Sequence, residues 1–292
     1  MISLEKKEKN IVKSGIKLSF LTLISRILGV IREATKAHFL GTSGLADAFG
    51  VAFLIPNLLR RLFAENSISV AFIPTFRGYL EESREKKETQ DFLNSTFTLI
   101  TFLTTAVVIA GILITPFIVK IFYNDVEQAV IQETIILTRI MFPYLIVISI
   151  AALFQGILNT MNIFSPSGFT PILFNLCVIA GTIFLSKKTE NPARAMSVGV
   201  ITGGVVQAVF QLPFVLKSGW KVSLTSFKKT FSNEGTKKVI SLVIPTIVGM
   251  ASYQLNDLVS TALAGRAGQG IVSSLQYSLR LQELILGIFA VS

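Results

Sequence analysis

Two arginines and a glutamate stand inside a stretch of the chain that is otherwise apolar enough to cross a membrane. Arg60, Arg61 and Glu65 lie within residues 54–66, where most of the other side chains are aliphatic or aromatic. An arginine at the centre of a membrane helix costs about 2.5–3.5 kcal/mol on insertion scales, so such charges usually face a protein interior or a wet cavity. The three side chains therefore indicate a polar site within a membrane protein.

Arginine is chemically suited to bind a diphosphate group. Its planar guanidinium donates paired hydrogen bonds to phosphate oxygens and stays charged at any accessible pH. Arg60 follows Asn57 by three residues and therefore shares a helix face with it, which favours a place for both on a cavity wall. Arg61 and Glu65 are four residues apart, and a mutual salt bridge is the alternative explanation for this pair.

The composition places the chain in a lipid bilayer. Hydrophobic residues make up 51% of the sequence, charged residues make up 15%, and the mean hydropathy is +0.64, which is too apolar for an ordinary soluble domain. The net charge of +10 would suit nucleic acid in a soluble protein, but the lysines fall between apolar runs and form no basic face interleaved with aromatic residues. We therefore expect membrane lipids, and no nucleic acid, as partners.

The sequence offers little to catalysis or metal binding. Its one cysteine, Cys177, and its one histidine, His38, lack the partners that metal sites and disulfides require. Residues 41–44 lack the Gly-Lys-Ser/Thr ending of a nucleotide-binding loop, and no nucleophile, base and orienting group occur together. We expect no enzyme, no catalytic residue, no metal and no cofactor.

Apolar stretches of about 20 residues, each long enough to cross a bilayer, recur along the chain. They predict an all-α, polytopic membrane helical bundle with one six-helix lobe (1–217), a basic cytoplasmic linker (218–237) and the first two helices of an incomplete second lobe (238–292). Residues 67–80 are expected to continue the second helix or to lie along the interface. The predicted spans are 12–34, 45–66, 92–119, 135–158, 168–186, 196–216, 238–262 and 272–292.

Lysine and arginine alternate in abundance between successive loops, which fixes the orientation because cytoplasmic loops carry an excess of them. With the N-terminus inside, the cytoplasmic segments hold 15 and the outer loops hold 6. The cytoplasmic residues lie in the N-terminal tail and in 77–91 and 217–238. The outer residues are Lys36, Lys120, Lys187, Lys188, Arg194 and Arg266.

A short glycine motif recurs between pairs of spans. Gly41 and Gly44, between the first two spans, match Gly265 and Gly268, between the last two. In both places the following helix carries an arginine and then a glutamate. Paired repeats around a site at the middle of the membrane are typical of secondary transporters, although glycines also simply make short connections.

The order and spacing of several motifs resemble those of the MurJ (MviN) lipid II flippases. The motifs are Ser25-Arg-Ile-Leu-Gly-Val-Ile-Arg-Glu33, Asp47-Ala-Phe49, Pro56-Asn-Leu-Leu-Arg-Arg-Leu-Phe-Ala-Glu65, Phe142-Pro143-Tyr144, Leu158-Asn159-Thr160, Gln211-Leu212-Pro213, and Arg280 with Glu283. The resemblance extends over essentially the whole chain, but members of that family are complete two-lobed bundles and this chain stops within the eighth helix. We therefore expect a truncated member or a fragment.

The resemblance implies roles for individual residues. It implies a cavity whose substrate-binding residues are Arg26, Arg32, Asn57, Arg60 and Arg280. Glu33, Asp47, Glu65 and Glu283 are expected to neutralise these arginines or to exchange with the substrate. Asp257, beside Asn256, is a weaker candidate for an ion site. Arg26 and Arg32 are six positions apart and differ by about 120° around an ideal helix, so they need not share a face.

The resemblance also implies a function without covalent chemistry. We expect a flippase in the bacterial inner membrane, with a cytoplasmic N-terminus, that moves lipid II to the outer leaflet by alternating access during cell wall biogenesis. Coupling to the membrane potential, Na⁺ or H⁺ is an accompanying hypothesis, as is a missing C-terminal half or a second copy that completes the cavity. The alternatives are an inactive or split fragment, a polysaccharide-lipid exporter, and a multidrug exporter, whose cationic substrates would favour acidic cavity residues.

Overall fold

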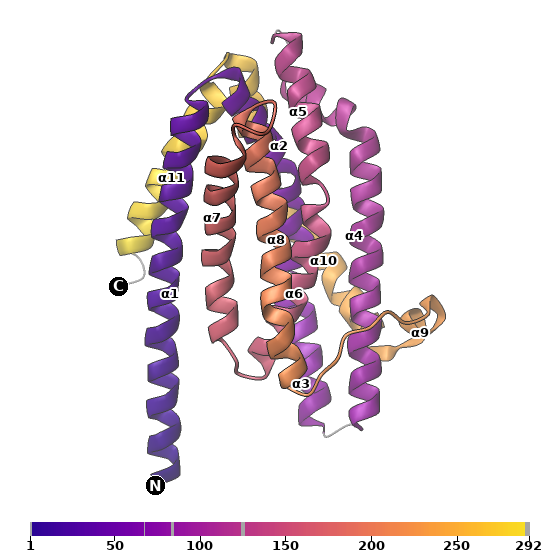
Figure 1. Ribbon diagram of the computed structural model, residues 1–292. Coiled ribbons are helices and arrows are strands. Elements are labelled where there is room, and N and C mark those ends of the chain that lie inside the picture. The colour runs from indigo at the N-terminus through magenta and orange to yellow at the C-terminus, as the bar shows by residue number, and fades with distance from the viewer. Residues whose placement is uncertain (1, 67, 83–84, 124–125, 290–292) are drawn as a thin grey trace.

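The chain folds into a bundle of helices that run along a common direction (Figure 1). The computed structural model describes the backbone of residues 2–66, 68–82, 85–123 and 126–289, and every regular element in these ranges is helical. This confirms the predicted all-α fold. The elements are α1 (Ile2–Leu40), α2 (Gly44–Leu59), η1 (Arg60–Asn66), η2 (Ile68–Phe72), α3 (Ile73–Glu81), α4 (Lys86–Phe122), α5 (Gln128–Met141), α6 (Tyr144–Thr160), α7 (Ser165–Leu185), α8 (Pro192–Lys217), α9 (Phe227–Ser232), α10 (Glu234–Ala267) and α11 (Ile271–Phe289).

Five helical segments in the described ranges are long and apolar enough to cross a membrane. They match the third to seventh predicted spans, while α1, α2 and α11 occupy the positions of the other three. The chain is therefore a multi-pass membrane protein. The five segments are Lys86–Phe122, Gln128–Thr160, Ser165–Leu185, Pro192–Lys217 and Glu234–Ala267. The helix α8 ends at Lys217 and α10 begins at Glu234, but the division into lobes stays a prediction.

Two prolines coincide with irregularities inside predicted spans. The span predicted over 135–158 is broken between α5 and α6 at Phe142 and Pro143. Pro56 lies near the end of α2, which gives way after Leu59 to the wider turns of the π-helical segment η1. Because proline lacks a backbone N–H and its ring crowds the preceding turn, both irregularities have a local cause. Residues 68–81 continue the chain in helical form as η2 and α3.

The helices of residues 1–217, which we call the first lobe after the predicted division, pack closely together. Helix α8 packs against α7 and α6, and α7 packs against α1. The backbones of α7 and α8 approach each other closely at two glycines. An added Cβ atom at Gly199 would stand 2.9 Å from the Cα atom of Val178, and one at Gly181 would stand 2.9 Å from the Cα atom of Gly199. Small residues let membrane helices approach in this way, so these glycines set the spacing between α7 and α8.

The last two helices lie against different parts of the first lobe. Helix α11 runs beside α1 (Figure 1) and contacts both α1 and α2, while α10 contacts α4, η1 and η2. The turn between α10 and α11 meets the turn between α1 and α2, since an added Cβ atom at Gly270 would lie 2.7 Å from the carbonyl oxygen of Thr42. The two glycine turns that the sequence pairs are therefore neighbours in space.

Candidate functional site

A cavity of about 730 Å³ opens between the first lobe and the last two helices. Its walls come from α1, α2, η1, α7, α8, α10 and α11. Among the described residues, five basic and two acidic side chains line it, and these seven together carry a net charge of +3. These side chains are Arg32, Lys36, Arg60, Arg61, Arg280, Glu33 and Asp257.

Glu33 joins arginines from two neighbouring helices of the cavity wall, α1 and α11. Its Oε1 atom lies 2.8 Å from Nη2 of Arg32 on α1 and 3.8 Å from Nε of Arg280 on α11. Arg32 also donates through Nη1 to Oδ1 of Asn175 on α7, at 3.1 Å, and stands 5.8 Å from the ring centre of Phe174. Because both charged atoms of the Arg32–Glu33 pair are largely shielded from solvent, the guanidinium is held in a fixed orientation at the cavity wall.

Another part of the wall, formed by α2 and η1, carries the residues singled out at the end of the second predicted span. Arg60 donates from Nε to Oδ1 of Asn57, at 3.1 Å, so the shared helix face expected for these two residues is confirmed. Arg61 lies 3.2 Å from Oδ2 of Asp257 on α10. The wider π-helical turn that begins at Arg60 directs successive arginines to the same cavity, a placement often found where such turns occur at functional sites.

Lys36 does not lie in an outer loop, which corrects its assignment from the sequence. It belongs to α1, is only 3% exposed, and donates from Nζ to Oε1 of Gln276 on α11 at 2.8 Å. The ammonium group also faces the rings of Phe49 and Tyr277, at 5.6 and 5.0 Å from their centres. Its position four residues after Arg32, on the same helix face, is the signal that could have found it.

Asp47 contacts a helix terminus, and it is absent from the described residues that line the cavity. The side chain is 3% exposed, and its carboxylate accepts hydrogen bonds from the backbone N–H groups of Gly270, at 2.5 Å, and Ser273, at 2.8 Å. The first N–H groups of a helix have no intrahelical partner, and a carboxylate at that end is favoured by the helix dipole. Asp47 thus ties α2 to the start of α11.

Three further predicted site residues are not among the described residues that line the cavity. Arg26 is partly exposed on α1 and is also absent from the described cavity lining, in keeping with its angular separation from Arg32. The side chains of Glu65 and Glu283 lie outside the part of the chain that the structure describes. The roles expected for these three residues, including the Arg61–Glu65 pair, stay predictions.

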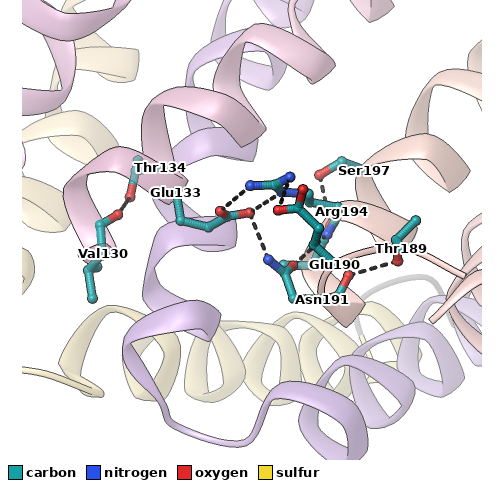
Figure 2. A network of polar contacts seen from close by, with 9 residues as sticks. Val130, Glu133, Thr134, Thr189, Glu190, Asn191, Arg194 and Ser197 are labelled. Atoms are coloured by element: carbon teal, nitrogen blue, oxygen red, sulfur yellow. Dashed lines mark hydrogen bonds and ion pairs between the residues drawn. The ribbon is translucent and has the colours of Figure 1, made fainter. Parts of the chain in front are cut away.

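A separate polar cluster joins α5 to the start of α8 (Figure 2). Arg194 donates from Nε and Nη2 to the two carboxylate oxygens of Glu133, both at 2.8 Å, and also pairs with Glu190. Asn191 donates to Glu133 at 2.9 Å and caps the N-terminus of α8 by accepting from the N–H of Arg194. Arg194, counted from the sequence as a loop residue, therefore belongs to a helix and a bidentate ion pair.

The geometry of the cavity is suited to an anionic, polyoxygen ligand. Guanidinium groups of Arg32 on α1, Arg60 on η1 and Arg280 on α11 surround one space, and each lies near a carboxylate or amide oxygen. A ligand phosphate offers more oxygen acceptors than one carboxylate does, so it can compete for the same N–H donors. The excess positive charge of the wall favours that exchange.

Comparison with known proteins places this architecture in a family. The sequence model of the family described as "Lipid II flippase MurJ" matches residues 36–292. The chain is 49% identical over 292 residues to a probable lipid II flippase MurJ of Treponema pallidum, with 98% of this chain and 55% of that protein aligned. It is 34% identical to the lipid II flippase MurJ of Burkholderia cenocepacia, over 97% of this chain and 55% of that one.

A solved structure shows the same fold. The structure named "Lipid II flippase MurJ, inward closed conformation" superposes with a TM-score of 0.78 and 29% sequence identity, and covers 95% of this chain and 56% of that chain. The chain thus spans about half the length of the relatives it matches. With a family match that extends over most of its residues, the chain belongs to the MurJ family.

Proposed function

We propose that this chain takes part in carrying lipid II, the lipid-linked peptidoglycan precursor, from the cytoplasmic to the outer leaflet of the bacterial inner membrane. The observation that carries the proposal is the group of Arg32, Arg60 and Arg280 around one cavity with a net positive wall. Lipid II joins its sugar-peptide headgroup to a polyprenyl tail through a diphosphate. Arginines in a partly dry cavity select such a linkage over neutral lipid headgroups.

Each wall residue has a task in this proposal. Glu33 pairs with both Arg32 and Arg280. In the proposal, Glu33 gives up their N–H groups when the two arginines bind the diphosphate oxygens. Lys36, one turn after Arg32 on α1, adds a point charge, and Arg60 with Asn57 contacts the headgroup from η1 and α2. No bond of the substrate is made or broken, because binding and release on opposite sides are enough for transport.

Alternating access requires a second lobe that moves against the first. The helices α10 and α11 contribute Asp257, Gln276 and Arg280 to the cavity, and the remaining wall comes in our proposal from a further lobe of a longer chain or from a second copy. The N-terminus is cytoplasmic, as the distribution of lysine and arginine predicts. A multidrug carrier of cations is disfavoured by the same net charge of the wall.

Transport of this kind needs a driving force, and we place it in the membrane potential. The described lining residues carry a net charge of +3, and such a charge responds to the field, which is worth about 2.3 kcal/mol per charge for each 100 mV fully crossed. A cation site at Asp257 would have to displace Arg61, which lies 3.2 Å away. Coupling to potential is therefore our first proposal, and Na⁺ or H⁺ coupling at Asp257 is the second.

Complementation tests the function. A bacterium depleted of its own flippase would express this chain, or the longer protein that contains it, as wild type, Arg32→Ala or Arg139→Ala. Arg139 is the matched control because it lies in a membrane helix but is exposed, with its Nε 3.4 Å from the carbonyl oxygen of Ile112. We expect outer-leaflet lipid II and growth to be restored by the wild type and by Arg139→Ala, and lost with Arg32→Ala.

Binding separates the site from the transport step. The purified chain would be titrated with undecaprenyl diphosphate. Because a hydrogen bond between charged partners is worth about 1.5–3 kcal/mol, loss of Arg32 should weaken binding of this lipid by roughly 10- to 150-fold. Equal affinity in wild type and Arg32→Ala would contradict the assigned site. Binding that survives while complementation fails in the longer protein would contradict the transport role alone.

A further inference from the structure

The segment between α8 and α10 combines exposed lysines with exposed apolar side chains. The apolar side chains are those of Leu224, Phe227 and Phe231, which are 67%, 50% and 48% exposed. Within residues 217–238 the only acidic residue is Glu234, while six lysines, all exposed, give the segment a net charge of +5. These lysines are Lys217, Lys221, Lys228, Lys229, Lys237 and Lys238.

The linker is fixed to α4 by a regular ladder of hydrogen bonds. Gln90, Asn94 and Thr98 stand one helical turn apart on α4, and their side chains bond to the backbone of Lys221, Ser223 and Thr225. Eight helical residues rise about 12 Å and four extended residues about 13 Å, so the two spacings match. The linker therefore climbs along α4 in a defined register.

This register determines the depth of α9 in the membrane. The ladder ends at Thr98, and one turn further the ring of Phe227 packs edge-on against Phe102, with ring centres 4.7 Å apart. The predicted span over 92–119 is about eight residues longer than the hydrocarbon core requires, so a core centred in it begins near residue 96. Phe102 then lies about 9 Å inside that core, and α9 lies beside this part of α4 (Figure 1). Interfacial helices bury their apolar face about 5–10 Å into the boundary between headgroups and acyl chains, which is the depth that the predicted span gives for Phe227.

The chemistry of the segment matches the two layers of that boundary. Phe227 and Phe231 are four residues apart on one helix face, while Lys228 and Lys229 have stems long enough to return their charges to the headgroups. Buried apolar area together with attraction to anionic lipid is what holds interfacial helices in place. Neither the phenylalanines nor the lysines belong to the cavity, because its described lining contains no residue of 217–238.

We propose that residues 221–238 form an anionic-phospholipid site that anchors the connection between the two lobes to the membrane surface. The occupant is the headgroup of an acidic phospholipid such as phosphatidylglycerol, bound by Lys221, Lys228 and Lys229 while Phe227 and Phe231 contact its acyl chains. The site is independent of the diphosphate cavity. It would hold the start of α10 at constant depth while the helices around the cavity move.

Lipid binding to the full chain tests the site. Fluorescent phosphatidylglycerol and fluorescent phosphatidylcholine would each be titrated with the purified chain in a neutral detergent, with anisotropy as the readout. The test variant is K221Q/K228Q/K229Q, and the control is K120Q/K187Q/K188Q, which removes three exposed lysines from the other end of the bundle. Melting followed by the fluorescence of Trp220, the only tryptophan, verifies that both variants are folded.

The expected results are specific. A lysine near an anionic surface contributes about fivefold to binding, so the test variant should lose at least tenfold in affinity for phosphatidylglycerol, and the control should stay within twofold. Wild type should prefer phosphatidylglycerol to phosphatidylcholine by at least tenfold.

Three results would overturn the proposal. One is an unchanged affinity in the test variant, and another is displacement of the lipid by millimolar inorganic phosphate, which would show a site for free phosphate. The third is displacement of phosphatidylglycerol by undecaprenyl diphosphate together with its loss in Arg32→Ala, which would move the lipid into the cavity. Failure of the cavity's own binding test leaves the linker result unaffected.

Discussion

Replacement of Asp47 by alanine should release the start of α11 from the first lobe. The carboxylate accepts from the N–H groups of Gly270 and Ser273 and is almost fully buried. Hydrogen bonds to a charged acceptor are worth about 1.5–3 kcal/mol each, and partial rehydration of the freed groups offsets some of that. We take about 3 kcal/mol as the local cost of Asp47→Ala, and about half of it for Asp47→Asn, which keeps one acceptor oxygen.

Hydrogen exchange measures this cost at the two amides themselves. Because the first N–H groups of a helix have no intrahelical acceptor, those of Gly270 and Ser273 depend on Asp47 for protection. A loss of about 3 kcal/mol raises the exchange rate by roughly 150-fold, and half that loss raises it by roughly tenfold. Asp91→Ala, which removes an exposed carboxylate from α4, serves as the matched control.

The outcome that refutes this reasoning is equally defined. If the amides of Gly270 and Ser273 exchange within threefold of the wild-type rate in Asp47→Ala, the carboxylate does not cap α11. If the amides around Ser197 in α8 accelerate to the same extent, the substitution has unfolded the protein globally and the assigned local role is also wrong.

Other substitutions test the packing, the polar cluster and the buried lysine. Gly199→Ala should lower the free energy of unfolding by about 1–3 kcal/mol, since its Cβ meets the backbone of α7, whereas Gly249→Ala, with open space around it, should change it by less than about 1 kcal/mol in thermal melts. Glu133→Gln should cost about 1–3 kcal/mol and be nearly silent in an Arg194→Ala background, which a double-mutant cycle in denaturant would reveal. Lys36→Met should weaken undecaprenyl diphosphate binding by roughly fivefold or more without lowering the melting temperature, and a tighter complex would contradict its placement in the cavity.

Hydropathy predicted the helices of this chain well, because each span must satisfy its backbone within itself and bury about 20 apolar residues. The limits of α8 and the start of α10 fall close to the predicted ones. The break at Pro143 and the π-helical turns after Pro56 are only hinted at by the prolines. The form of both irregularities depends on which neighbouring groups bond to the backbone groups that lose their helical partners, and those neighbours cannot be identified from the sequence.

Site residues could be predicted where the cost of burying a charge in the membrane determines their position. They could not be predicted where the position depends on a contact with a residue far away in the sequence. Arg60 with Asn57 follows from helix spacing, and Arg32 and Arg280 reach the cavity. Lys36 was assigned to a loop because counting by sides ignores how far a helix extends past the membrane core. The contacts of Asp47 with Gly270 and of Glu133 with Arg194 join residues far apart in the chain, and local patterns carry no information about such pairs.

The contacts between α11 and the first lobe form one continuous polar series. Asp47 holds the first turn of α11, the next contacts are from Lys36 to Gln276 and from Tyr277 to the carbonyl oxygen of Gly41, and the last is from Glu33 to Arg280. From residue 270 to residue 280 this series covers about 15 Å of helix. Polar partners exchange for water or for ligand oxygens at small net cost, unlike a packed apolar seam. A ligand that takes over Arg32 and Arg280 therefore acts at one end of a series whose other end is the turn between α10 and α11.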